Sequence, residues 1–227
     1  MKIGLAIAIS ALWLASGLQA GTIVGTVRAK GPDPKITDSE AGKYQSRRYK
    51  FAERIDYSRL RDFVVYIDQP MTNPPAASPA KPIKVVTQKD VTFLPHVLPV
   101  VVGTPVEWPN EDDIFHNVFS MSKKKEFNLG FYKGREAKPV IFDEPGRVDV
   151  FCAIHTKMHC IVLVLENPHF VVVDERGRFV IPNVPAGAYK LTAWHERLPS
   201  QTKEITVPEK AEVKVDFTLG LSELPKN

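Results

Sequence analysis

Three soft side chains lie three residues apart late in the sequence: Cys152, His155 and Met158, within the stretch FCAIHTKMHC. A thiolate, an imidazole and a thioether are donors that proteins use to bind copper and related metals. The same residues could also be ordinary packing groups at the edge of a strand. The spacing raises the question of a metal site, and other residues must decide it.

A histidine upstream favours a metal site over a set of packing residues. His116 follows an acidic run, EDD, and begins the apolar stretch HNVFS. Two imidazoles, a thiolate and a thioether form a trigonal site with a weak axial ligand, which suits copper in electron transfer. Carboxylates are missing from this donor set, which argues against magnesium and calcium. Zinc accepts two histidines and a cysteine, but a structural zinc site more usually has a fourth strong donor than a thioether.

These motifs resemble the ligand pattern of the cupredoxin (blue copper) family. The resemblance covers about residues 84–165 and is carried by Asn110, the pair His116-Asn117 and the run Cys152-x2-His155-x2-Met158. The short ligand loop is similar to that of amicyanin, and the segment resembles the plastocyanin-like proteins of methylamine utilisation. The resemblance implies one mononuclear type 1 copper ion with His116, Cys152 and His155 as equatorial ligands and Met158 as the axial ligand. It also implies that Asn117 holds the ligand loop by hydrogen bonds.

Cys160 departs from the family pattern. Blue copper proteins usually have a glycine two residues after the methionine, and here Cys160 takes that place, after His159. Cys152 and Cys160 are the only cysteines of the chain. Two cysteines in an oxidising compartment form one disulfide by default. Cys160 is therefore expected either to be a buried apolar thiol or to pair with Cys152 when copper is absent.

The N-terminus has the layout of a secretory signal peptide. Lys2 is followed by an apolar run from Ile3 to Leu14 and by small residues that end at Ala20. This segment, residues 1–20, is too short for a membrane span, although cleavage after Gly17 is an alternative. We expect an exported, periplasmic protein with no integral membrane segment in the mature chain. The formal net charge of +4 is mild, and the KKK run at 123–125 is more typical of a solvated turn than of a nucleic-acid patch.

The remainder of the chain indicates short strands. Alternating or continuous apolar stretches broken by Gly, Pro, Asn and Asp predict an antiparallel sandwich or barrel. These strands are expected at 21–29, 63–68, 83–86, 97–102, 105–108, 117–120, 138–142, 147–151 and 161–165. A short helix is expected near 57–62. The charged segment 30–62 is predicted to be a surface excursion, and the proline-rich segment 70–82 a loop.

The last quarter has a different pattern. Strands are expected at 170–173 and 179–181, followed by the turn NVPAG and two further alternating stretches that end at Leu219. This segment resembles the carboxypeptidase regulatory-like, transthyretin-type β-sandwich, which implies a structural or interaction module without catalytic machinery. His96, His169 and His195 are expected to be packing or surface groups.

The sequence thus predicts an all-β chain of two modules. A cupredoxin-like Greek-key sandwich occupies 21–166, a small carboxypeptidase regulatory-like sandwich occupies 167–220, and a tail follows at 221–227. The predicted function is single-electron transfer by a copper ion, with an unidentified redox partner protein and no nucleic acid. A periplasmic copper carrier or delivery protein, or an interaction module without a metal, are the alternatives. No enzyme motif is found, because the chain lacks GxSxG, a phosphate loop and HExxH, and the acidic run 111–113 is expected to be a solvated turn.

Overall fold

The computed structural model describes residues 20–31, 56–71, 83–134 and 137–220. Nearly all of the predicted signal peptide, most of the segments 30–62 and 70–82, and the tail 221–227 lie outside these ranges. Within them the regular structure is β-strand, apart from one 3-10 turn, η2 (Tyr57–Arg59). The predicted all-β class is confirmed. None of the described residues belongs to a helix that could span a membrane.

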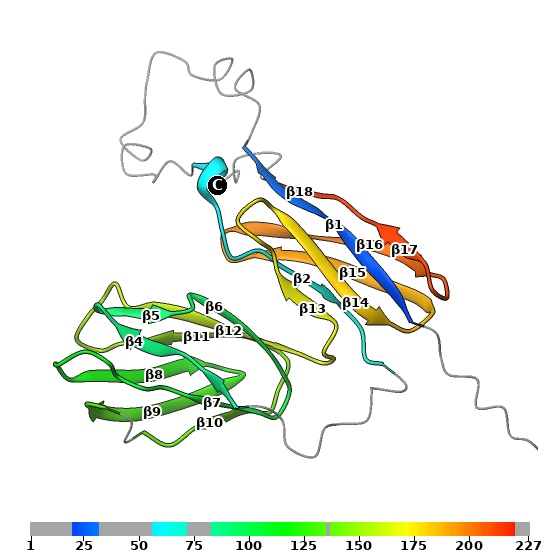
Figure 1. Cartoon of the computed structure of the whole chain (residues 1–227). Helices are drawn as coiled ribbons and strands as arrows, with labels where there is room; N and C mark the ends of the chain where they lie inside the picture. Colours follow the sequence, from blue (N-terminus) through cyan, green and yellow to red (C-terminus); the bar gives the residue numbers. More distant parts are fainter. Residues whose placement is uncertain (1–19, 32–55, 72–82, 135–136, 221–227) are drawn as a thin grey trace, which may run out of the picture.

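The first sandwich comprises residues 83–134 and 137–165 and is drawn in green in Figure 1. One sheet has the order β10-β7-β3, with β10 (Val140–Phe142), β7 (Thr104–Glu107) and β3 (Lys84–Val85). The other sheet has the order β6-β12-β11-β8-β9, with β6 (Val97–Val101), β12 (His159–Leu165), β11 (Gly146–Phe151), β8 (His116–Ser122) and β9 (Lys125–Tyr132). A separate hairpin pairs β4 (Thr87–Lys89) with β5 (Thr92–Leu94). The pairs β3·β7 and β6·β12 are parallel and the others antiparallel. Strands that are neighbours in a sheet, such as β6 and β12, are not consecutive in the chain, which is the non-sequential order of a Greek key.

The second sandwich also has two sheets. One contains β14 (Arg178–Val184), β1 (Gly21–Lys30), β17 (Glu212–Lys214) and β18 (Phe217–Gly220). The other has the order β13-β2-β15-β16, with β13 (Phe170–Val172), β2 (Val64–Ile67), β15 (Gly187–His195) and β16 (Leu198–Val207). Alternate residues of these strands point inward and form a core of their own, with Ile23, Phe179, Leu191 and Phe217 among its members.

The predicted boundary between the modules was wrong at the N-terminal side. β1 pairs antiparallel with β14 and parallel with β17 and β18, and β2 lies between β13 and β15. Residues 21–31 and 56–71 therefore belong to the second sandwich, as the blue and cyan strands of Figure 1 show. Gly25 of β1 packs closely against the C-terminal segment, because a Cβ atom at this position would lie 1.7 Å from the carbonyl oxygen of Val215. Alternation along the chain predicts a strand but does not identify a partner so far away in sequence.

The first sandwich is thus inserted into the second one. β2 and β13 are antiparallel neighbours, with Val65 opposite Val171, and the whole segment 83–165 lies between them in sequence. β12 links the two cores because both of its faces are buried. Cys160, Val162 and Val164 face the first core. Ile161, Leu163 and Leu165 face a layer that includes Val64, Tyr66, Phe170 and Trp194 of the second sandwich.

Candidate metal centre

The predicted ligands come together at one end of the five-stranded sheet of the first sandwich. Cys152 directly follows β11, and Met158 directly precedes β12, so the hairpin β11·β12 is closed by residues 152–158, called here the ligand loop. β8 lies on the other side of β11 with Phe119 opposite Phe151. Because these two strands are antiparallel, His116 at the start of β8 lies at the same end of the sheet as the ligand loop.

Three donor atoms converge there. Nδ1 of His116 lies 3.0 Å from Nδ1 of His155, and Sγ of Cys152 lies 3.8 Å from the same His155 nitrogen. The donor atoms of the three residues all lie within 4.8 Å of one another. Two nitrogens bound to one first-row ion at about 2.0 Å are at most about 4 Å apart, and a sulfur at about 2.3 Å is at most about 4.3 Å from either nitrogen. The separations of 3.0 and 3.8 Å from the His155 nitrogen are therefore those of ligands that share one ion.

The ligand loop is closed by its own backbone. The N–H of Met158 donates to the carbonyl of His155 at 2.8 Å, and the N–H of Cys152 donates to the carbonyl of Met158 at 3.3 Å. Met158 is 1% exposed and Cys152 is 4% exposed, and both belong to the first core. The thioether is thus held inside the protein, in the same core as the thiol, and is shielded from solvent as an axial ligand would be.

His116 is oriented by a carboxylate that the sequence analysis placed in a solvated turn. Nε2 of His116 donates to Oδ2 of Asp112 at 2.7 Å, which leaves Nδ1 with the lone pair that a metal needs. Asp112 also accepts the N–H groups of Asp90 and Val91. Partial burial raises the pKa of this carboxyl, but the hydrogen bonds from Val91, His116 and Asp90 outweigh it and hold the pKa below its usual range. The spacing of four residues between Asp112 and His116 was the signal available in the sequence.

Asn110 shapes the turn that contains this carboxylate. Its amide nitrogen donates to the carbonyls of Ile114 and Tyr132, and its oxygen accepts the N–H of Asp112. Asn117 does not hold the ligand loop, contrary to the prediction. Its amide nitrogen donates to Asn128 and to the carbonyl of Gly130, both on β9, and its Oδ1 atom has no partner among the described residues.

The site is enclosed except at one ligand. His116 is fully buried, whereas His155 is partly exposed. Apolar side chains that flank the ligands in sequence are open to solvent, namely Ile114, Phe115 and Ile154, which are 44%, 56% and 50% exposed. His155 therefore has the most accessible side chain of the four predicted ligands.

Both cysteines are free thiols in the structure, and both are buried. Cys160 is fully buried in the first core, and this burial, together with the charge of Asp149, raises the pKa of its thiol well above the usual range. Of the two alternatives for Cys160, the structure has the buried thiol. His169 and His195 are also buried, as expected for packing groups.

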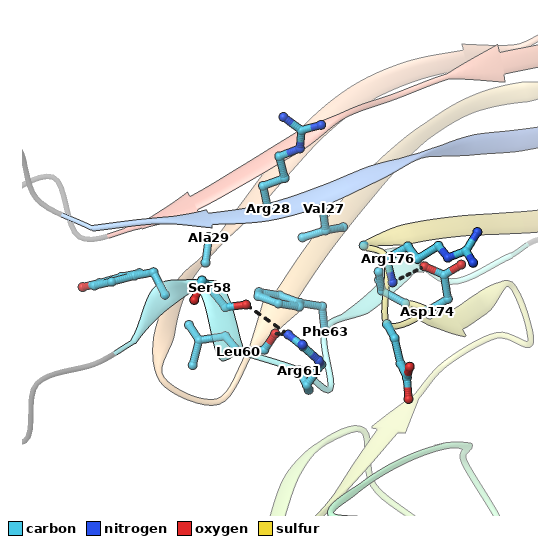
Figure 2. Close-up of a pocket in the computed structure, with 13 residues that line it drawn as sticks. Val27, Arg28, Ala29, Ser58, Leu60, Arg61, Phe63, Asp174 and Arg176 are labelled. Atoms are coloured by element: carbon cyan, nitrogen blue, oxygen red, sulfur yellow. Dashed lines mark hydrogen bonds between the residues drawn. The ribbon is translucent and has the colours of Figure 1, made fainter.

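A cavity of about 260 Å³ lies elsewhere, in the second sandwich, between β1, η2 and the turn at 174–177. Figure 2 shows its apolar side chains, with Val27, Leu60 and Phe63 among them, and a rim of charged groups. The rim groups bond to their own surroundings: Arg61 donates to the carbonyls of Ser58 and Leu60, and Asp174 accepts the N–H of Arg176. The lining contains neither histidine nor cysteine, so the cavity lacks the donors that make the ligand loop a candidate metal site.

Comparison with known proteins gives two kinds of match. The family model of the carboxypeptidase regulatory-like domain matches residues 161–220. This match agrees with the predicted carboxypeptidase regulatory-like module, and the strand topology gives the two predicted β-sandwiches. No curated protein matches the chain.

Solved structures similar to part of the chain include a nitrite reductase, a purple cupredoxin and amicyanin variants. A Cu-containing nitrite reductase from Thermus scotoductus is 26% identical over 44% of this chain, with a TM-score of 0.37, and the match spans 26% of the reductase. A purple cupredoxin from Nitrosopumilus maritimus is 24% identical, with a TM-score of 0.32, over 36% of this chain and 98% of its own length. A Cu(I) form of an amicyanin variant is 25% identical, with a TM-score of 0.34, over 44% of this chain and 97% of its own length.

Proposed function

We propose that the protein is an exported electron carrier that binds one mononuclear type 1 copper ion through His116, Cys152, His155 and Met158. The observation that carries the proposal is the convergence of His116, His155 and Cys152, whose donor atoms lie within 4.8 Å of one another, at a loop that ends in a buried methionine. Copper bound by such a donor set exchanges one electron between its +1 and +2 states.

The chain contributes a fixed geometry. Asp112 holds the ring of His116, two backbone hydrogen bonds close the ligand loop, and the core holds the side chains of Cys152 and Met158. Ligands that cannot move keep the same positions in both oxidation states, so little reorganisation accompanies electron transfer. The apolar surroundings of the cysteine sulfur contribute to the redox potential.

The partly exposed imidazole of His155 is the proposed route for the electron. Its ring is the ligand side chain open to solvent, next to the exposed Ile154. An apolar surface around this histidine suits brief docking of a redox partner protein in the periplasm. A predicted signal peptide supports that location, and no catalytic role is proposed.

Copper delivery is the competing function, and the burial of the site disfavours it. A delivery protein must let the receiving protein's ligands reach the metal. Here His116, Cys152 and Met158 are at most 4% exposed, so a receiving protein could approach from the side of His155 alone.

Reconstitution with Cu(II) tests the proposal. The loaded protein is expected to bind one copper per chain, to show an intense thiolate-to-copper charge-transfer band, and to give a reversible one-electron wave in voltammetry. Cys152→Ser should lose the band while the far-UV circular dichroism stays that of a β protein, and Cys160→Ala, the matched control, should keep it. Copper binding without the band or the reversible wave would favour copper delivery as the function. Failure to bind copper would refute the site.

A further inference from the structure

A second group of metal donors lies where the two sandwiches meet. His96, His159 and Glu196 each offer one donor atom, and these atoms lie within 4.8 Å of one another. His96 immediately precedes β6 and His159 begins β12, both in the first sandwich, whereas Glu196 lies in the turn between β15 and β16 of the second. From the sequence, His96 was expected to be a packing or surface group.

The hydrogen bonds determine which ring nitrogen of each histidine has a lone pair. Nδ1 of His96 lies 3.1 Å from the carbonyl oxygen of His159, which can only accept, so this nitrogen carries the proton. Nε2 of His159 lies 2.9 Å from a carboxylate oxygen of Asp149 and is likewise a donor. The lone pairs are therefore on Nε2 of His96 and Nδ1 of His159. A histidine whose other nitrogen donates to a carbonyl or carboxylate is the usual form of a metal ligand.

The contact between His96 and Glu196 requires either a proton or a metal ion between the two atoms. Nε2 of His96 lies 3.0 Å from Oε1 of Glu196, and neither a lone pair nor a carboxylate oxygen can donate to the other. A proton on Nε2 would be sufficient for this pair alone. It would not account for the third donor, His159, whose ring is oriented by Asp149 and stacked on Phe151 with centroids 4.8 Å apart.

The charges agree with a divalent ion. Asp149 is paired with Arg147 at 2.6 Å, so its charge is balanced. Glu196 has His96 as its ion-pair partner within the described ranges, which leaves one carboxylate and two imidazole nitrogens to face the ion. Two nitrogens and one carboxylate oxygen, with room for water because all three side chains are 22–34% exposed, form the donor set of an open zinc site.

We propose that His96, His159 and Glu196 form a second metal site, for a divalent ion of the zinc type, that joins the two sandwiches. Donors sharing one ion lie within about 4 Å of each other, and the donor atoms here lie within 4.8 Å of one another, so only small side-chain adjustments are needed to bind an ion. His159 is the residue after Met158, and Phe151, which stacks on it, is the residue before Cys152. An ion bound here therefore fixes both ends of the ligand loop to the second sandwich.

Zinc titration of the copper-loaded protein tests this site, because copper occupies the ligand loop and its charge-transfer band reports any displacement. We expect one Zn²⁺ per chain by calorimetry, no loss of the band, and a higher melting temperature. Glu196→Gln, which keeps the shape of the side chain, should weaken zinc binding by more than about tenfold and remove the rise in melting temperature. Glu175→Gln makes the same change at an exposed turn of the second sandwich and should bind zinc like the wild type.

His96→Ala is the second variant and should also lose the ion. The same titration on a Cys152→Ser chain tests the site without copper, so it does not depend on the first site being a copper centre. Absence of zinc binding in the copper-loaded wild type would show that His96 and Glu196 form only an ion pair. Unchanged zinc affinity in Glu196→Gln or in His96→Ala would overturn the proposed ligands.

Discussion

The carboxylate of Asp112 should control how tightly the first site binds copper. It accepts three hydrogen bonds, from Nε2 of His116 at 2.7 Å, from the N–H of Asp90 at 2.7 Å and from the N–H of Val91 at 3.0 Å. Because Oδ2 accepts two of these bonds and Oδ1 accepts one, an asparagine at this position can keep its oxygen toward His116 and Val91. Only the bond from Asp90 and the negative charge are then lost.

Asparagine and alanine at position 112 should therefore weaken copper binding to different extents. Loss of a group that orients a metal-bound histidine typically lowers metal affinity by about 10- to 100-fold, or about 1.4–2.7 kcal/mol. We expect Asp112→Asn near the lower figure, because the ring of His116 stays oriented. We expect Asp112→Ala near the upper figure, because all three hydrogen bonds are lost. Competition with a copper chelator, followed by the charge-transfer band, gives both affinities.

The neighbouring Asp113 provides the control. Its side chain is fully exposed and pairs with Lys133 at 3.2 Å, so Asp113→Ala removes the same charge from the same turn without contacting His116. This variant should bind copper like the wild type. A metal-independent measurement is the Nε2–H signal of His116 in nitrogen-15 spectra, which should be protected from exchange in the wild type and lost in Asp112→Ala. Equal affinities for both Asp112 variants and the wild type, or a weaker Asp113→Ala, would refute the orienting role.

Four further predictions concern other parts of the molecule. His155→Gly should open the first site to exogenous imidazole, whereas the fully buried position of His116 should make His116→Gly far less responsive, as followed by the recovery of colour. Oxidised apo-protein should load copper poorly until it is reduced, and Cys160→Ala should remove that dependence without a shift of the absorption band; a shifted band would place the sulfur on the metal. Ile161→Ala, at a fully buried position between the sandwiches, should lower the free energy of unfolding in urea by about 2–5 kcal/mol and leave the band unchanged. Burial lowers the pKa of His169 below its ordinary value near 6.5. Between these two pKa values the unfolded chain binds a proton that the folded chain does not, so stability falls as the pH falls through this range. His169→Leu should flatten this pH dependence in urea titrations at pH 5–7.

The strands that the sequence predicted are mostly those with a strong apolar pattern. The run CIVLVL of β12 is apolar without interruption because both faces are buried, and the alternation of β1 matches its half-buried position. The missed strands are β9 and β16, each at the edge of its sheet, and the separate two-stranded hairpin β4·β5. Edge strands such as TKEIT in β16 carry polar and charged residues, so their periodicity is weak.

Local spacing predicted which donors could meet, but not what surrounds them. The three-residue steps from Cys152 to Met158 place these side chains on one short loop wherever it folds. The interpretation of Asp112 as part of a solvated turn failed because its partners, the N–H groups of Asp90 and Val91, come from a hairpin about twenty residues earlier. The cluster at His96 was missed for the same reason. Glu196 is about one hundred residues away in sequence and reaches His96 only because the two sandwiches pack together.

The insertion of one sandwich into the other sets an order of assembly. All strands of the first sandwich lie between 84 and 165, so its contacts can be completed before the chain beyond that point has been made. β1 must wait for β14, β17 and β18, the last of which ends at Gly220, and long loops of this kind close late. A chain interrupted after residue 165 would keep all four ligands of the first site. It would also leave β1 and β2 without their partner strands and the outer face of β12 uncovered, so such a fragment would fail through aggregation rather than through loss of metal ligands.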